Sequence, residues 1–276
     1  MKRSILPAHL DKLTGSIYGH YWTVVPHLKG MVRRWSAGHR ERIDIAFNDP
    51  VSGPLSAGGF LHRPPAAETL FILVHGLGGR PESAYVREAA QRFWSLGHGV
   101  LRMGLRGAEG HQPDFYHAGL TTDLEMVLST PPVRQFKRCF IVGFSLGGHV
   151  ALTLAANEKI EGVSGVVSVC APLDLRACQV WLDRSPINFY RKHCLDGLKR
   201  TLRAVRTMAD QKGLTIPVDW SRLNAIKTIY DWDDAMVVPR FGFGSVEAYY
   251  DRISVGPKLD DLYVPALIIS ARHDPR

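Results

Sequence analysis

The sequence predicts an α/β fold in which a mostly parallel sheet carries helices on both faces. Short apolar runs of strand type alternate with helical patterns between about residues 70 and 170, and this alternation is typical of parallel strands joined by right-handed crossovers. One run, Leu70-Phe71-Ile72-Leu73-Val74, is apolar throughout, as expected for a central strand that is buried on both faces. Another run ends in the turn Gly143-Phe144-Ser145-Leu146-Gly147, and a helical pattern follows it directly.

The individual elements follow from local patterns of apolar and turn-forming residues. Alternating or continuous apolar runs predict strands, and Pro and Gly at their borders mark turns. One helix has Pro81 at its start and Gly97 at its end, which are favourable residues for those positions. We expect a turn at Pro131-Pro132. We further expect strands at 42–47, 55–62, 99–103, 163–170 and 265–271, and helices at 82–96, 120–128 and 146–156.

The turn around Ser145 predicts the chemistry. Gly-x-Ser-x-Gly between a strand and a helix is the nucleophile elbow of the α/β-hydrolases. A serine hydroxyl is a weak nucleophile, and it must stand clear of the sheet to meet both a base and an acyl carbon. The sharp turn leaves no room for side chains at Gly143 and Gly147, and the following helix points its free N–H groups at developing negative charge. The motif therefore predicts that Ser145 is a nucleophile.

The loop after the third predicted strand is expected to bind the substrate. It reads His-Gly-Leu-Gly-Gly over residues 75–79. In α/β-hydrolases one oxyanion-hole N–H comes from this loop and the other from the residue after the serine. We therefore assign the backbone N–H groups of Leu77 and Leu146 to the oxyanion hole. The glycines let the main chain approach the substrate closely, and the substrate-binding loop comprises His75, Gly76 and Gly78.

A helical cap is expected after the sixth strand. From about Arg176 to Ser254 the alternation of strands and helices stops, and long inserts at this point of the fold commonly form a lid over the serine. The predicted division is a lead-in packed on the core at 1–40, the hydrolase core at 41–175, the cap at 176–254, and a core continuation with the seventh strand and the acid loop at 255–276.

One segment of the cap has the pattern of a basic amphipathic helix. Apolar residues recur at helical spacing between Tyr190 and Val205, and arginines and lysines fill the other positions. Such a helix can lie on an anionic membrane. The solvated outer face of a cap helix explains the same pattern and is the simpler interpretation.

Composition limits the classes of function. Of the 276 residues, 45% are apolar and 22% are charged, which is ordinary for a globular protein with a substantial core. The net charge of +8 favours anionic surfaces, but no zinc-finger spacing or RNA-binding signature supports nucleic acid. No apolar run reaches the roughly 18 residues of a membrane span, and the start lacks the apolar segment of a signal peptide. The four cysteines have no metal-site spacing, so we expect reduced thiols, a cytoplasmic protein and no metal.

Several motifs together resemble the YheT-like branch of the α/β-hydrolases. The resemblance runs from about residue 18 to 276, and it rests on residues 75–79, 101–107, 143–148 and 231–234, and on Gly242-Phe243 and Tyr249-Tyr250. It implies a serine hydrolase of carboxyl esters, often short-chain or lipid-derived, that uses no metal or organic cofactor. By the same comparison, Ser145 is the nucleophile and Asp274 is the triad acid.

The resemblance also implies a histidine base after the acid. The triad of this fold runs Ser, then Asp or Glu, then His along the chain. Only two residues follow Asp274, and neither is His. The resemblance implies an eighth strand and a closing helix after the acid as well. Among the other histidines, His149 lies one helical turn beyond Ser145 and should point away from it, His75 is a loop-orienting residue, and His273 adjoins Asp274 too closely to face it. His193 in the cap, and His111 and His117 after the fourth strand, stay open as distant candidates.

The remaining carboxylates have separate interpretations. Asp174, after the sixth strand, occupies an alternative acid position known in this superfamily, but it brings no base with it. Asp114 and Asp123 are interpreted as helix caps or surface charges.

These observations leave several functions open. The first is a serine esterase of which these residues are a fragment, because the chain stops directly after a core strand and would leave an unprotected sheet edge. The second is a non-catalytic relative that binds acyl or lipid ligands, or a partner protein, in the old pocket. The third is a thioesterase or an acyltransferase, because enzymes of both kinds share this elbow.

Overall fold

The computed structural model describes residues 40–157, 161–185 and 189–271. Its centre is a seven-stranded sheet in the order β1-β2-β4-β3-β5-β6-β7. The strands are β1 (Glu41–Asp49), β2 (Gly53–His62), β3 (Thr69–Val74), β4 (Gly99–Gly104), β5 (Arg138–Phe144), β6 (Val163–Val169) and β7 (Ala266–Ile269). Strand β2 is antiparallel to β1 and β4, and the other pairs are parallel. The mostly parallel sheet is confirmed, and all of the predicted lead-in except Arg40 lies outside the described residues.

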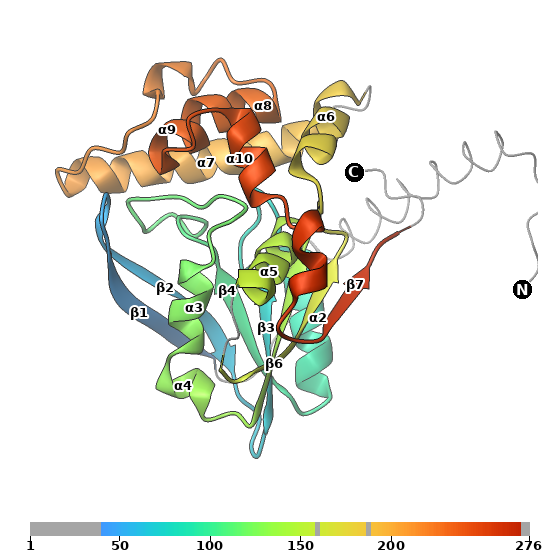
Figure 1. Cartoon of the computed structure of the whole chain (residues 1–276). Coiled ribbons are helices and arrows are strands. Elements are labelled where there is room, and N and C mark those ends of the chain that lie inside the picture. Colours follow the sequence, from blue (N-terminus) through green and yellow to red (C-terminus); the bar gives the residue numbers. More distant parts are fainter. Residues whose placement is uncertain (1–39, 158–160, 186–188, 272–276) are drawn as a thin grey trace, which may run out of the picture.

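Helices cover both faces of this sheet (Figure 1). On one face, Leu73 packs with Val86 of α2 (Ala84–Ser95). On the other face, Ile72 and Val74 share a core with Val150 and with residues of α3 and α5. This alternation follows from the period of two residues along a strand. The helices on this second face are α3 (Thr122–Leu128) and α5 (Leu146–Asn157).

The residues predicted to form a turn at Pro131-Pro132 form instead the short helix α4 (Pro131–Arg134). Proline is tolerated in the first turn of a helix because the N–H that it lacks would have no intrahelical partner there.

The strand order places a topological switch point at the carboxyl end of β3. Strand β3 lies between β4 and β5, so the chain leaves β3 for one neighbour and later returns on its other side. Ligands in open α/β sheets bind outside the carboxyl ends of the strands at such a switch point. Both predicted site loops, the one after β3 and the one after β5, begin at this point.

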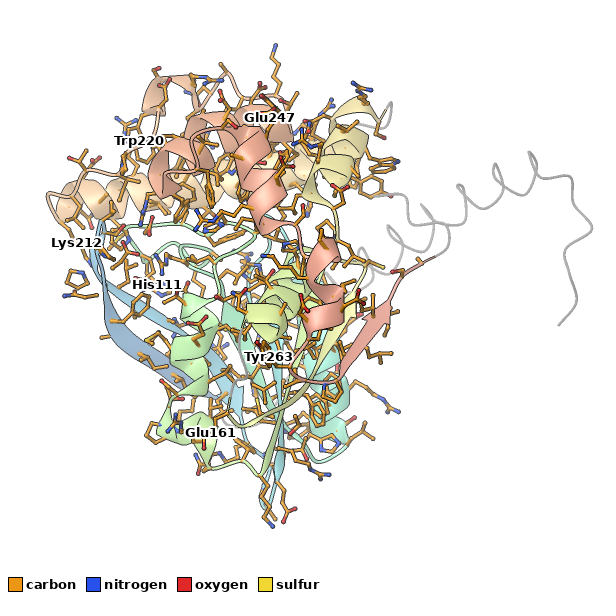
Figure 2. All side chains as sticks on the ribbon, in the orientation of Figure 1. His111, Glu161, Lys212, Trp220, Glu247 and Tyr263 are labelled. Carbon is orange, nitrogen blue, oxygen red and sulfur yellow. The ribbon has the colours of Figure 1, made fainter. Side chains whose placement is uncertain are left out.

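The segment predicted as a cap is helical and lies over the carboxyl end of the sheet (Figure 1). Its helices are α6 (Leu175–Arg184), α7 (Phe189–Gln211), the 3₁₀ turn η1 (Trp220–Arg222), α8 (Ile229–Trp232), the π-helical turn η2 (Asp233–Val237), α9 (Val238–Phe241) and α10 (Val246–Ile253). A 3₁₀ segment, η3 (Gly256–Asp261), then leads to β7. Glu247 of α10 lies at the cap end, and Glu161, before β6, lies at the opposite end (Figure 2).

Helix α7 is amphipathic, as its sequence pattern predicts. Leu198, Leu202 and Val205 are buried in a core that continues into the sheet. Arg200 and Arg203 are exposed on the outer face. Contact of this face with an anionic membrane stays a prediction. Within the described residues, no helix is long and apolar enough to cross a membrane.

Buried ion pairs attach the cap to the core. Arg240 of α9 donates to Asp114 through Nε at 2.9 Å and Nη2 at 2.6 Å. Arg106, after β4, contacts Asp114 at 2.9 Å and Asp123 at 2.7 Å, and both arginines reach Asp49 of β1. Asp114 and Asp123 are buried, so their expected role as caps or surface charges is wrong. They are the counter-ions that two buried arginines require.

Candidate active site

Ser145 lies in a strained turn between β5 and α5. Its φ is +50°, a left-handed conformation that non-glycine residues rarely adopt and that is often found at functional sites. Its N–H donates to Val169 of the neighbouring strand at 2.8 Å, and its carbonyl accepts from Gly148 and His149 of α5. These bonds hold the strained turn in place. The serine itself remains partly exposed.

The glycines beside Ser145 are required by close backbone contacts. A Cβ on Gly143 would lie 2.1 Å from the carbonyl oxygen of Gly147, and one on Gly147 would lie 2.4 Å from that of Val74. Neither contact is compatible with a side chain. The same distances show that the end of β3 packs against the elbow, so the two predicted site loops are brought together.

The loop at 75–79 passes directly beside the serine. A Cβ on Gly76 would lie 3.2 Å from Cβ of Ser145. In the part of the chain that the structure describes, the backbone N–H groups of Leu77 and Leu146 have no hydrogen-bond acceptor. Both residues that the sequence assigns to the oxyanion hole therefore keep a free donor.

His75 fixes the start of this loop through hydrogen bonds at both ring nitrogens. Nδ1–H donates to the Gly76 carbonyl at 2.8 Å, and Nε2 accepts from the Leu105 N–H at 3.1 Å. The first bond needs a proton on Nδ1 and the second needs a bare Nε2, so the buried ring is neutral with a single tautomer. Burial lowers the pKa of His75 to about 4. The ring can therefore orient the loop, and its nitrogens are unavailable as a base.

We expect acidification to destabilise the protein through His75. The unfolded chain takes up this proton near pH 6.5, whereas the folded chain resists it until about pH 4. The stability contributed by the neutral ring is complete above pH 6.5 and is lost as the pH falls toward 4, by up to about 3 kcal/mol. Urea denaturation at pH 7.5, 6, 5 and 4 measures this loss.

The matched variant for this measurement is His75→Gln, whose amide keeps one donor and one acceptor but does not titrate. Other buried histidines titrate in both proteins, so the difference between the two pH curves isolates His75. The wild type should lose more stability than the variant below pH 6.5. Parallel curves would show that the neutral ring contributes nothing.

None of the described histidines is hydrogen-bonded to the Ser145 hydroxyl. His149 points away, as its spacing predicts: its nitrogens lie 2.6 Å from the carbonyl oxygen of Pro172 and 3.0 Å from that of Ile253. His111 lies on the outer side of the molecule near Arg42 of β1 (Figure 2). The identity of the triad base stays a prediction.

The predicted acid, Asp274, lies outside the described residues. The alternative, Asp174, is the N-cap of α6 and accepts from the Ala177 N–H at 2.9 Å, so it serves the helix. Within the described ranges, no group of three or more His, Cys, Asp or Glu is arranged to hold a metal ion.

Sequence reasoning did not identify two tyrosines that contact the loop. The Gly76 N–H donates to the Tyr85 hydroxyl at 2.9 Å, and the Gly78 N–H donates to the Tyr116 hydroxyl at 2.8 Å. These tyrosines come from α2 and from the loop after β4. No local pattern links them to the glycines, because a side chain–backbone bond across 38 residues has no periodicity.

Comparison with known proteins agrees with this geometry. A family model described as the alpha/beta hydrolase family matches residues 71–276. "Putative esterase YheT" of Escherichia coli (strain K12) is 31% identical over 214 residues, which cover 74% of this chain and 61% of that protein. Monoacylglycerol lipase of Saccharomyces cerevisiae is 22% identical over 305 residues, covering 98% of this chain and 68% of that one.

Among solved structures, the esterase Pf2001 of Pyrococcus furiosus is similar with a TM-score of 0.48 and 15% identity, over 88% of this chain and 89% of that one. The chain spans about three fifths of the length of YheT. With the elbow, the strand order and the matching family model taken together, the chain belongs to the α/β-hydrolase family and resembles YheT within it.

Proposed function

We propose that this chain is a serine hydrolase of carboxyl esters with Ser145 as its nucleophile. The observation that carries the proposal is the strained, partly exposed serine beside the free N–H groups of Leu77 and Leu146. A strained conformation persists only where the surrounding structure holds it. Donors aimed at the position of a developing oxyanion are the largest single contribution to catalysis of acyl transfer.

The proposed reaction is acyl transfer in two halves. Oγ of Ser145 attacks the acyl carbon while its proton passes to a base, and the carbonyl oxygen becomes an oxyanion that accepts from the N–H groups of Leu77 and Leu146. Collapse of this intermediate expels the alcohol, which takes the proton, and leaves an acyl-serine. Water then attacks the same carbon by the same route and releases the carboxylic acid and the free serine.

We propose Asp274 as the triad acid and a histidine outside the described residues as the base. The described histidines are engaged elsewhere, as shown above for His75 and His149. Without a base, only about 10³–10⁴-fold acceleration over water would remain from the oxyanion hole and substrate binding.

We propose short-chain or lipid-derived acyl esters as substrates, with no metal or organic cofactor. The names of the relatives support this class: one is an esterase and another a monoacylglycerol lipase. We also propose a cytoplasmic location, supported by the finding that no disulfide joins the four cysteines, since thiols stay reduced in that compartment.

A fluorophosphonate probe tests the nucleophile directly. We expect covalent labelling of the wild type at Ser145, located by mass spectrometry of the labelled peptide, and none in Ser145→Ala. Labelling is a sharper measurement than ester turnover, because loss of any triad member leaves the same residual hydrolysis. An unlabelled but folded wild type would contradict the proposal.

A second function is favoured by one observation, namely that no described histidine reaches the Ser145 hydroxyl. This function is non-catalytic binding of acyl or lipid ligands beside the elbow. It predicts a folded protein that resists the probe yet binds a fatty acid or monoacylglycerol, measured by calorimetry. Labelling at Ser145 would exclude it.

A further inference from the structure

We infer that Tyr85 and Tyr116 are positioning residues that select the Leu77 N–H as the oxyanion donor of the loop. The inference rests on the proposed function and deepens it. In this glycine-rich loop the N–H of Leu77 has no acceptor, whereas the N–H groups of the neighbouring residues do.

The polar groups of the loop can be accounted for one by one. The Gly76 N–H donates to Tyr85 at 2.9 Å and the Gly78 N–H donates to Tyr116 at 2.8 Å. The Gly79 N–H donates to the Gly76 carbonyl at 3.0 Å. Among the described residues, only the Leu77 N–H lacks an acceptor along the stretch from Gly76 to Gly79.

The two hydroxyls hold the residues on either side of Leu77. Tyr85 belongs to α2, and its hydroxyl lies 3.6 Å from a Cβ built on Gly76 and 2.8 Å from one on Gly79. The Tyr85 hydroxyl is therefore close to both ends of the turn. Tyr116 comes from the loop after β4 and is only 3% exposed. Because the N–H groups on both sides of Leu77 have an acceptor, the peptide group of Leu77 is held in one orientation.

Both tyrosines are themselves fixed by packing. The Tyr116 ring meets the His75 ring edge-on at 5.9 Å, and the Tyr85 ring meets Phe144, the residue before the serine, at 5.2 Å. Burial raises the pKa of Tyr116, so its hydroxyl stays neutral. A rigid neutral hydroxyl accepts a hydrogen bond from the amide N–H without placing a competing anion beside the oxyanion hole.

Flexible glycines make such supports necessary. Gly78 has a φ of +68°, and a glycine explores many conformations when it is not held. Without the hydroxyl of Tyr116, the Gly78 N–H would lose its acceptor and the turn could rotate the Leu77 N–H away from the serine. The loss would be felt in the transition state, because only there does an oxyanion exist.

The test compares Tyr116→Phe and Tyr85→Phe with Tyr249→Phe. Tyr249 is a matched control: it is buried, and its hydroxyl accepts a backbone N–H from Ala118 at 3.0 Å instead of one from residues 75–79. The readout is the inactivation of each protein by a fluorophosphonate, resolved into the binding constant of the probe and the rate constant of bond formation to Ser145. Thermal melting checks that each variant is folded.

We expect Tyr116→Phe to slow bond formation by about tenfold, a fraction of the 10²–10³ lost when an oxyanion donor is removed outright. Probe binding should change less than about twofold, and Tyr249→Phe should react like the wild type. Affinity for a trifluoromethyl ketone, which forms a tetrahedral adduct, should fall by the same factor as the rate. A merely structural role would not separate rate from binding.

The outcomes separate the two proposals. If the wild type does not react, the proposed function fails. If the wild type and Tyr116→Phe react equally fast, the inference fails and the proposed function stands. Should Tyr116→Phe not fold, Tyr85→Phe decides, because Tyr85 is partly exposed. An unchanged rate in that variant would overturn the inference, and a slowed rate with unchanged binding would support it.

Discussion

Replacing Arg240 with methionine is expected to lower the free energy of unfolding by about 3–5 kcal/mol, the usual cost of breaking a buried ion pair by removing one partner. Arg240 and Asp114 have side chains that are 4% and 0% exposed. Methionine fills similar space but leaves three carboxylates, two of them fully buried, with Arg106 as the one remaining arginine of the cluster. Urea denaturation at neutral pH measures the loss.

The matched control is Arg222→Met. Arg222 contacts Asp234 at 2.7 Å, close to the 2.6 Å of the Arg240 pair. The side chains of Arg222 and Asp234 are, however, 44% and 43% exposed. Exposed pairs contribute about 0–1 kcal/mol, so this variant should be nearly as stable as the wild type. Equal losses in the two variants would show that burial does not decide the strength of the Arg240 pair.

Replacing Gly197 with alanine is expected to slow the labelling of Ser145 by about 10²-fold while leaving the protein folded. Gly197 lies on α7, and a Cβ there would meet the Gly78 carbonyl oxygen at 2.4 Å and its Cα at 2.7 Å. Both contacts are with backbone, so the loop must move. A displacement of about 1 Å in a catalytic group costs up to 10²-fold, whereas alanine itself favours a helix by about 1 kcal/mol over glycine.

Thr207→Ala is the control for this prediction. Thr207 is exposed on the same helix, and its replacement also raises helix propensity without touching the loop. Its labelling rate should equal that of the wild type. If Gly197→Ala were labelled as fast as this control, the contact between α7 and the loop would have no part in the site.

The elbow is the part of the site that could be predicted best from the sequence. Gly143, Ser145 and Gly147 lie within five consecutive residues, and a strand followed at once by a helix forces a turn that excludes side chains. The loop after β3 could be assigned for a similar reason, since its place in the chain fixes its place beside the serine. The short helix α4 was missed because two prolines suit a turn and a helix start equally well.

Ion pairs and hydrogen bonds between residues far apart in the chain could not be predicted from the sequence. Asp49, Asp114 and Arg240 have ordinary surface-type side chains in the sequence, and their spacing carries no period. Only packing of the cap on the core brings them together in one largely buried cluster. The hydroxyls of Tyr85 and Tyr116 likewise became acceptors only when α2 and the loop after β4 met the glycines.

The sequence by itself determined the order of strands and helices, the strained serine and the loop that faces it. These features are local: they depend on side-chain size, backbone freedom and a period of two or 3.6 residues. The tertiary structure alone decided which amide of the loop stays free and which charges are buried. Those outcomes depend on desolvation and on contacts between distant segments, and neither is written in any short stretch of residues.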